Sequence, residues 1–89
     1  MKKLLFFHAP WCPPCRCYDR EIITPLGQRI GNDRIIRVNA QKDPFTAEKY
    51  GVEKLPTIVI IDGNERFMQS TGGFTVDELE KLMKESDKN

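Results

Sequence analysis

Three cysteines lie within six residues of one another, at Cys12, Cys15 and Cys17. Cysteines so close together cannot link distant parts of a fold, whereas a secreted disulfide scaffold spreads an even number along the chain. In an intracellular protein, a cluster of this kind is typical of redox chemistry or of metal binding. The two chemistries to weigh are therefore thiol–disulfide exchange and thiolate coordination of a metal.

The segment 12–15 reads Cys-Pro-Pro-Cys and follows an apolar run, so it is predicted to open a helix after a strand. A spacing of three places both sulfurs on the first helical turn, close enough to form a disulfide. The free N–H groups and the positive dipole end of a helix N-terminus favour a thiolate there. Cys12 adjoins the loop, so we predict that it is the more exposed, nucleophilic sulfur. Cys15 is then the buried resolving thiol.

A metal site is the alternative, with zinc or an iron–sulfur cluster held by Cys12, Cys15 and Cys17 and His8 as a further ligand. Two residues along a helix correspond to a rotation of about 200°. The sulfurs of Cys15 and Cys17 would therefore converge on one ion only if the helix unwound. A fourth cysteine is also missing. On this reasoning no metal is expected, and Cys17 is interpreted as a buried or half-exposed small apolar residue.

The elements that must position these residues can be read from hydrophobic patterns and turn signals. Strands are predicted at 2–7, 35–39, 57–61 and 65–70, and helices at 12–30, 44–50 and from 76 onward. In the first helix, an apolar residue every fourth position, from Tyr18 to Ile30, marks the core face. Thr24-Pro25 should kink or end that helix, because Pro25 has no N–H to donate. Thr75 and Glu78 form a capping-box pattern for the last helix.

The predicted order is β-α-β-α-β-β-α. A strand–helix–strand unit implies a parallel pair joined by a right-handed crossover, and Asp62-Gly63 signals an antiparallel hairpin. The fold class is therefore α/β, with a four-stranded mixed sheet covered by helices on both faces. We expect a single domain over residues 1–89, with residues 86–89 fraying.

Composition limits the possible functions. The chain has 89 residues, 14 Lys+Arg against 13 Asp+Glu, and 39% hydrophobic residues, which allows one small core but not two domains. A net charge of +1 gives no electrostatic reason to expect binding to nucleic acid or to a membrane. The apolar run at 4–7 is too short for a signal peptide, and no stretch approaches the roughly 18 apolar residues of a transmembrane helix. A soluble, cytoplasmic protein is therefore expected.

Several motifs occur together: Ala-Pro-Trp-Cys-Pro-Pro-Cys at 9–15, Leu-Pro-Thr at 55–57, and Gly72 before the last helix. On these motifs the chain resembles the thioredoxin family over nearly its whole length. The resemblance implies a thioredoxin fold in which Pro56 follows a cis peptide bond and faces the sulfurs. Only about 5–6% of X–Pro bonds are cis, so this expectation is specific.

The resemblance also implies a surface for docking substrates. The backbone of Leu55 would pair with an extended substrate peptide. Trp11 would pack beside the thiols, and the same surface would include Pro13 and Pro14. The glycines Gly72 and Gly73 would line the groove.

The chain departs from the family pattern at several places. Only seven residues precede His8, whereas thioredoxins usually have a further strand and helix there. Phe6 occupies the place of a buried Asp that assists proton transfer at the second cysteine, so water or His8 is the candidate for that role. Arg37 stands where the family has a Lys, and a guanidinium cannot act as a base.

The expected function is that of a monomeric protein disulfide reductase without a bound cofactor. By resemblance, its electrons come from NADPH through a flavin-dependent thioredoxin reductase, and its substrates are oxidised proteins. The alternative is a glutaredoxin reduced by glutathione. Short length, Phe6 and Gly72-Gly73 before Asp77 favour it, whereas Ala9 stands where glutaredoxins usually have a Lys.

Overall fold

The computed structural model describes residues 2–85, so the expected fraying of residues 86–89 lies outside the described part of the chain. The strands are β1 (Lys2–His8), β2 (Ile35–Asn39), β3 (Thr57–Asp62) and β4 (Glu65–Ser70). The helices are α1 (Pro13–Tyr18), α2 (Thr24–Ile30), α3 (Pro44–Lys49) and α4 (Val76–Glu85), with a π-helical turn (Asp19–Ile23) and a 3₁₀ turn (Asn32–Arg34). The predicted element order is confirmed.

The four strands form one mixed sheet in the order β2-β1-β3-β4. β1 pairs in parallel with β2 and antiparallel with β3, and β4 is an edge strand antiparallel to β3. The parallel pair is joined by a helical crossover, and β3 and β4 are joined by a hairpin, as the sequence predicts. The turn residues are Gly63 and Asn64, one position later than predicted, because Asp62 still pairs with Glu65.

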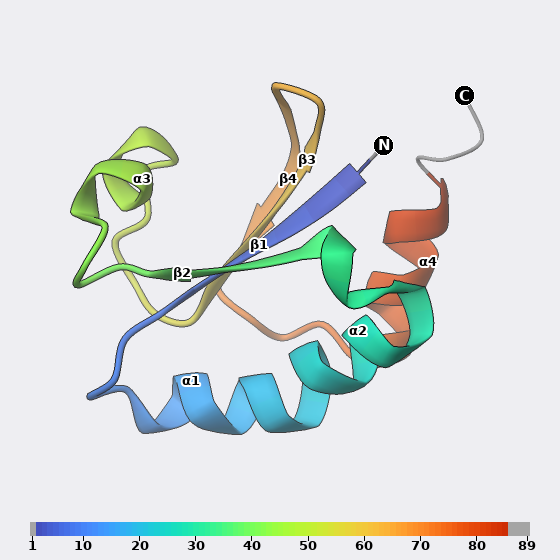
Figure 1. Cartoon of the computed structure of the whole chain (residues 1–89), viewed down its shortest axis with the longest axis horizontal. Coiled ribbons are helices and arrows are strands. Elements are labelled where there is room, and N and C mark those ends of the chain that lie inside the picture. Colours follow the sequence, from blue (N-terminus) through green and yellow to red (C-terminus); the bar gives the residue numbers. More distant parts are fainter. Residues whose placement is uncertain (1, 86–89) are drawn as a thin grey trace.

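Strand alternation divides the core into two clusters, one on each face of the sheet. Leu4 and Phe6 face α1, α2 and α4, whereas Leu5 and Phe7 face α3. Figure 1 shows this arrangement, with α3 apart from the other helices on the opposite side of the sheet. Because β1 is covered on both faces, it is a nearly continuous apolar run.

The long first helix is interrupted where Pro25 predicts a disturbance. Pro25 cannot donate a hydrogen bond to the carbonyl of Glu21, and the backbone responds with the π-helical turn 19–23 before α2 begins. The turn changes the phase of the helix. Ile23 is therefore fully buried and Ile22 only partly, although the four-residue spacing predicted Ile22 on the core face.

The caps follow the sequence closely. Thr75 Oγ1 accepts from the Glu78 N–H at 3.2 Å, and Glu78 Oε1 accepts from the Thr75 N–H at 2.9 Å, which confirms the capping box. Gly31, at a φ of 104°, ends α2 in a conformation that favours glycine. Within residues 2–85, no helix has the length and apolar content to cross a membrane.

Candidate active site

The strand register brings the predicted site residues to one end of the sheet. His8, the last residue of β1, pairs with Asn39, the last residue of β2. Phe7 pairs with Thr57, the first residue of β3, so Pro56 and the loop after β1 lie at the same end of the sheet. Ser70, at the end of β4, pairs with Ile58, so the following loop, with Gly72 and Gly73, begins at the same end of the sheet.

Cys12 and Cys15 form a disulfide at the start of α1, with their Cα atoms 5.3 Å apart. Cys12 is the N-cap residue, and its Sγ accepts a hydrogen bond from the Cys15 N–H at 3.3 Å. Pro13 and Pro14 occupy the first helical positions, where a missing N–H leaves no hydrogen bond broken. A backbone N–H therefore already points at Cys12 Sγ, and the same contact can stabilise a thiolate.

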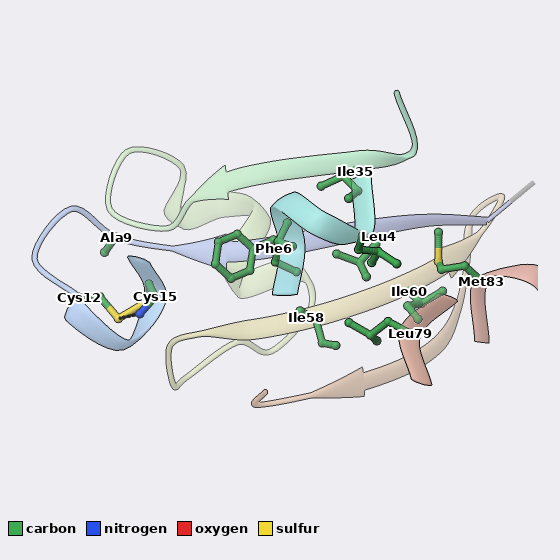
Figure 2. Packing of buried hydrophobic residues seen from close by; sticks show 12 residues of the cluster. Leu4, Phe6, Ala9, Cys12, Cys15, Ile35, Ile58, Ile60, Leu79 and Met83 are labelled. Atoms are coloured by element: carbon green, nitrogen blue, oxygen red, sulfur yellow. Dashed lines mark hydrogen bonds between the residues drawn. A yellow bond between two sulfur atoms is a disulfide. The ribbon is translucent and has the colours of Figure 1, made fainter. Parts of the chain in front are cut away.

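Both cysteines are buried in the disulfide form. Cys12 is 4% exposed and Cys15 is 1% exposed, so the predicted order holds but the difference is small. Figure 2 shows the disulfide at one end of the apolar cluster, with Phe6 between it and Leu4. The site is therefore a continuation of the core and not a separate loop structure.

The Leu55–Pro56 bond is cis, which confirms the expectation from the family resemblance. Pro56, Pro14, Gly72 and Gly73 line one hollow of about 400 Å³ beside α1. The two glycines each have a φ of 89°, a conformation that L residues with side chains rarely adopt. The structure thus gathers four of the predicted docking residues around a single groove.

Tyr18 ties this groove to α1. Its hydroxyl donates to the Phe74 carbonyl at 3.1 Å, and its ring lies 3.8 Å from where a Cβ on Gly72 would be. Burial raises the pKa of the Tyr18 hydroxyl, so it remains a neutral donor at physiological pH. The loop after β4 is consequently fixed against the helix that carries the cysteines.

Trp11 and Leu55 line a second hollow of about 390 Å³, on the side of α3. Trp11 is 66% exposed, which agrees with its predicted place at the surface. Glu48 and Glu53 are exposed and line the same hollow. Pro13 is exposed at the start of α1 and is not among the lining residues of either hollow.

A third, smaller hollow of about 90 Å³ lies against Cys15. Phe6 forms part of its wall and stacks on the ring of His8, with centroids 5.6 Å apart. Asp19 and Arg16 complete its polar lining. The end of β1 therefore places His8 near the site, as predicted.

Asp19 is held by a charged hydrogen-bond network. Arg37 on β2 donates from Nε and from one terminal nitrogen to the two carboxylate oxygens, at 3.0 and 2.8 Å, and Thr24 Oγ1 donates at 3.0 Å. The Arg37 hydrogen bonds hold the pKa of the Asp19 carboxyl below its usual value. Sequence reasoning named Arg37 but missed Asp19, because the π-helical turn that carries it was not predicted.

Cys17 is exposed, so the expectation of a buried or half-exposed residue is wrong. It lies beyond the first turn of α1, where its thiol contacts the side chains of Glu21 and Arg20 at 3.5 and 3.4 Å. Among the described residues, no group of three His, Cys, Asp or Glu side chains is arranged to hold a metal ion. The sulfurs of Cys12 and Cys15 are instead bonded to each other.

The structure is an α/β domain with a disulfide at the start of a helix, and comparison with known proteins identifies its family. The thioredoxin family model matches residues 1–85, so the chain belongs to the thioredoxin family. The chain is 32% identical over 85 residues to chloroplastic thioredoxin M4 of Arabidopsis thaliana, covering 90% of this chain and 42% of the relative. It is 31% identical over 78 residues to thioredoxin of Bacillus subtilis, covering 86% and 74%.

Solved structures of other proteins have the same fold as this chain. Thioredoxin-2 of a malaria parasite superposes with a TM-score of 0.83 at 24% identity, over 96% of this chain and 82% of that chain. Oxidised mitochondrial thioredoxin 3 of Saccharomyces cerevisiae superposes with a TM-score of 0.77 at 27% identity, over 94% and 77%. The chain spans only 42% and 59% of the lengths of the thioredoxin M4 relative and of a Synechocystis thioredoxin.

Proposed function

We propose that this chain is a thiol–disulfide oxidoreductase that reduces disulfide bonds in proteins. The proposal rests on the Cys12–Cys15 disulfide. It forms across the first turn of α1, at the end of the sheet where Pro56 also lies. Membership of the thioredoxin family supports the same activity. No bound cofactor is required, since the two sulfurs carry both electrons.

In the first step, the Cys12 thiolate attacks a substrate disulfide. A bond forms between Cys12 Sγ and one substrate sulfur, and the other substrate sulfur leaves with the electron pair and takes a proton. The Cys15 N–H donates to Cys12 Sγ at 3.3 Å, which favours the thiolate over the thiol. Cys12 also adjoins the exposed Trp11, on the side from which a substrate can approach.

In the second step, Cys15 loses its proton and attacks Cys12 Sγ in the mixed disulfide. The Cys12–substrate bond breaks, the Cys12–Cys15 bond forms, and the second substrate sulfur leaves as a thiol. The substrate disulfide is thus reduced to two thiols, and the protein dithiol is oxidised to a disulfide. The short sequence separation of three lets this closure occur without rearrangement of the fold.

Substrate docking is assigned to the two hollows beside the disulfide. The groove at Pro56, Gly72 and Gly73 takes the extended substrate chain. Leu55, which precedes Pro56 and lines the second hollow with Trp11, offers backbone hydrogen bonds to that chain. Trp11 and Pro13 cover the flank of the cysteine pair. These assignments give a reason for the large exposed area of Trp11. An indole ring in contact with water is unfavourable unless it serves to bind a partner.

Reduction of insulin by dithiothreitol, followed by turbidity, tests the activity. Cys12→Ser should fall to the uncatalysed rate, whereas Cys17→Ser should keep the rate of the unmodified chain because that thiol lies outside the disulfide. Full activity in Cys12→Ser would refute the proposal. Cys15→Ser should accumulate a mixed disulfide with the substrate, visible as a mass increase that dithiothreitol removes.

We further infer that the electron donor is NADPH, through a flavin-dependent thioredoxin reductase, and that the protein works as a cytoplasmic monomer. The family membership supports a reductase over glutathione as donor. Measuring the rate at which each donor reduces the Cys12–Cys15 disulfide separates them. Faster reduction by glutathione with glutathione reductase than by thioredoxin reductase would overturn this choice.

A further inference from the structure

Cys15 needs a proton acceptor that its immediate packing does not provide. The residue is 1% exposed, and burial disfavours the charged thiolate that must attack the mixed disulfide. Phe6, which packs in the same cluster, has no group that can take a proton. The proton must therefore leave through the small hollow that Cys15 lines.

Three other ionisable side chains line this hollow: His8, Arg16 and Asp19. Arg16 stays protonated, and its guanidinium donates to the Pro10 carbonyl at 2.8 Å. Asp19 is already the acceptor of hydrogen bonds from Arg37 and Thr24, and the lowered pKa of its carboxyl makes it a poor base. The imidazole of His8 is the remaining group, and a neutral imidazole has a ring nitrogen that can accept a proton.

Strand pairing and ring stacking also hold His8 at this hollow, where it can accept a proton. As the last residue of β1 it is paired with Asn39, and its ring stacks on Phe6 at an interplanar angle of 16°. The Asp19 carboxylate interacts electrostatically with His8, so a negative charge lies near the imidazole. Arg37, reaching across from β2, fixes that carboxylate through two hydrogen bonds.

We propose that His8 accepts the proton of Cys15 across this hollow, and that Asp19, held by Arg37, is the positioning residue for the imidazolium. A hollow of about 90 Å³ has room for water that can relay the proton. The Cys15 thiolate then attacks Cys12 Sγ, the substrate thiolate leaves, and the imidazolium returns the proton to it or to solvent. The inference rests on the proposed two-step exchange and concerns its second step alone.

A coloured disulfide separates the two steps. In a Cys17→Ser background, which removes the exposed third thiol, reduced protein is mixed with 5,5′-dithiobis(2-nitrobenzoate). Attack by Cys12 releases one coloured thiolate, and attack by Cys15 releases the second. His8→Gln should leave the first phase unchanged and slow the second about 100-fold near pH 7, because a glutamine amide cannot take up the proton.

Asp19→Asn should slow the second phase and leave the first unchanged, because the imidazolium loses its negative neighbour. Asp77→Asn is the matched control, since Asp77 is a surface carboxylate paired with Arg29 at the junction of α2 and α4. It should change neither phase. Imidazole added to His8→Ala should restore the second phase, which a loss of folding could not explain.

The inference is overturned if the second phase of His8→Gln keeps the rate of the parent. Equal slowing of both phases, or no rescue of His8→Ala by imidazole, overturns it as well. Absence of the first phase in the parent protein would instead refute the proposed exchange through Cys12. The two failures are therefore distinguishable in one experiment.

Discussion

Phe6 allows a quantitative test of how much a buried residue next to the site contributes to the stability of the fold. It is 1% exposed and lies between His8 and Tyr18, with ring centroids at 5.6 and 6.2 Å. Phe6→Ala removes the whole ring from a closely packed cluster. The lost burial and the resulting cavity should together lower the free energy of unfolding by about 3–5 kcal/mol.

That loss is large for so small a domain. A chain of this length has a total stability of roughly 5–13 kcal/mol. At the unfolding entropy typical of its size, the melting temperature should fall by about 15–25 °C. Phe6→Leu keeps most of the buried volume and should lower the stability by less than half as much.

Urea unfolding of the oxidised protein, followed by far-ultraviolet circular dichroism, measures these changes. Phe45→Ala is the control, because it deletes the same ring from a residue that is 79% exposed. Its effect should stay within about 0.5–1 kcal/mol. If Phe6→Ala and Phe45→Ala lower the stability equally, burial of the Phe6 ring does not stabilise the core and the reasoning is wrong.

Three further predictions concern the cap, the ion pair and the disulfide. Thr75→Ala should lower the stability by about 1 kcal/mol, measured by urea unfolding, because it breaks the capping box of α4. Asp19→Asn should be less stable than the parent near pH 7. Because the Arg37 hydrogen bonds lower the pKa of the folded carboxyl, the difference should vanish as the pH falls from about 4 through that pKa. Reduction of Cys12–Cys15 should lower the stability by about 2 kcal/mol, since the disulfide closes a very short loop.

Each of these has its own control. Thr75→Ser retains a hydroxyl and should recover most of the loss, and an equal loss would contradict the capping argument. Two parallel stability curves from pH 7 to pH 2 would show that the Asp19 ion pair contributes no pH dependence. Equal melting temperatures for the reduced and oxidised protein would contradict the loop-closure estimate.

The strands and the caps could be predicted because their signals are local. The β-branched run at 57–61 and the boundaries of β2 and β4 follow from residue type and turn chemistry alone. The capping residues of α4 are three positions apart, so their pairing is visible in the sequence. The cysteine pair was likewise predictable, because its spacing and its helix start lie within a few residues.

What the sequence concealed depends on contacts between distant elements. The pairing of Asp19 with Arg37 requires the π-helical turn and the parallel β1–β2 register together, and neither has a local signal. Lys2 is 1% exposed, although lysine is among the residues least often buried. Its ammonium lies over the Phe67 ring at 3.0 Å and donates to the Leu82 carbonyl at 3.2 Å. Only the folded arrangement of β4 and α4 creates that environment.

The central position of β1 has a consequence for the order in which the protein is assembled. Leu4 pairs with Ile35 on one side and with Ile60 on the other, so β1 is made before both of the strands with which it pairs. Pairing across such sequence distances slows folding relative to helical domains of similar size. During synthesis, Cys12 and Cys15 emerge well before β3 and the groove opposite them. The sulfurs are thus made before Pro56 and the glycines of the groove, and the reactive centre is complete only after those later residues have been added.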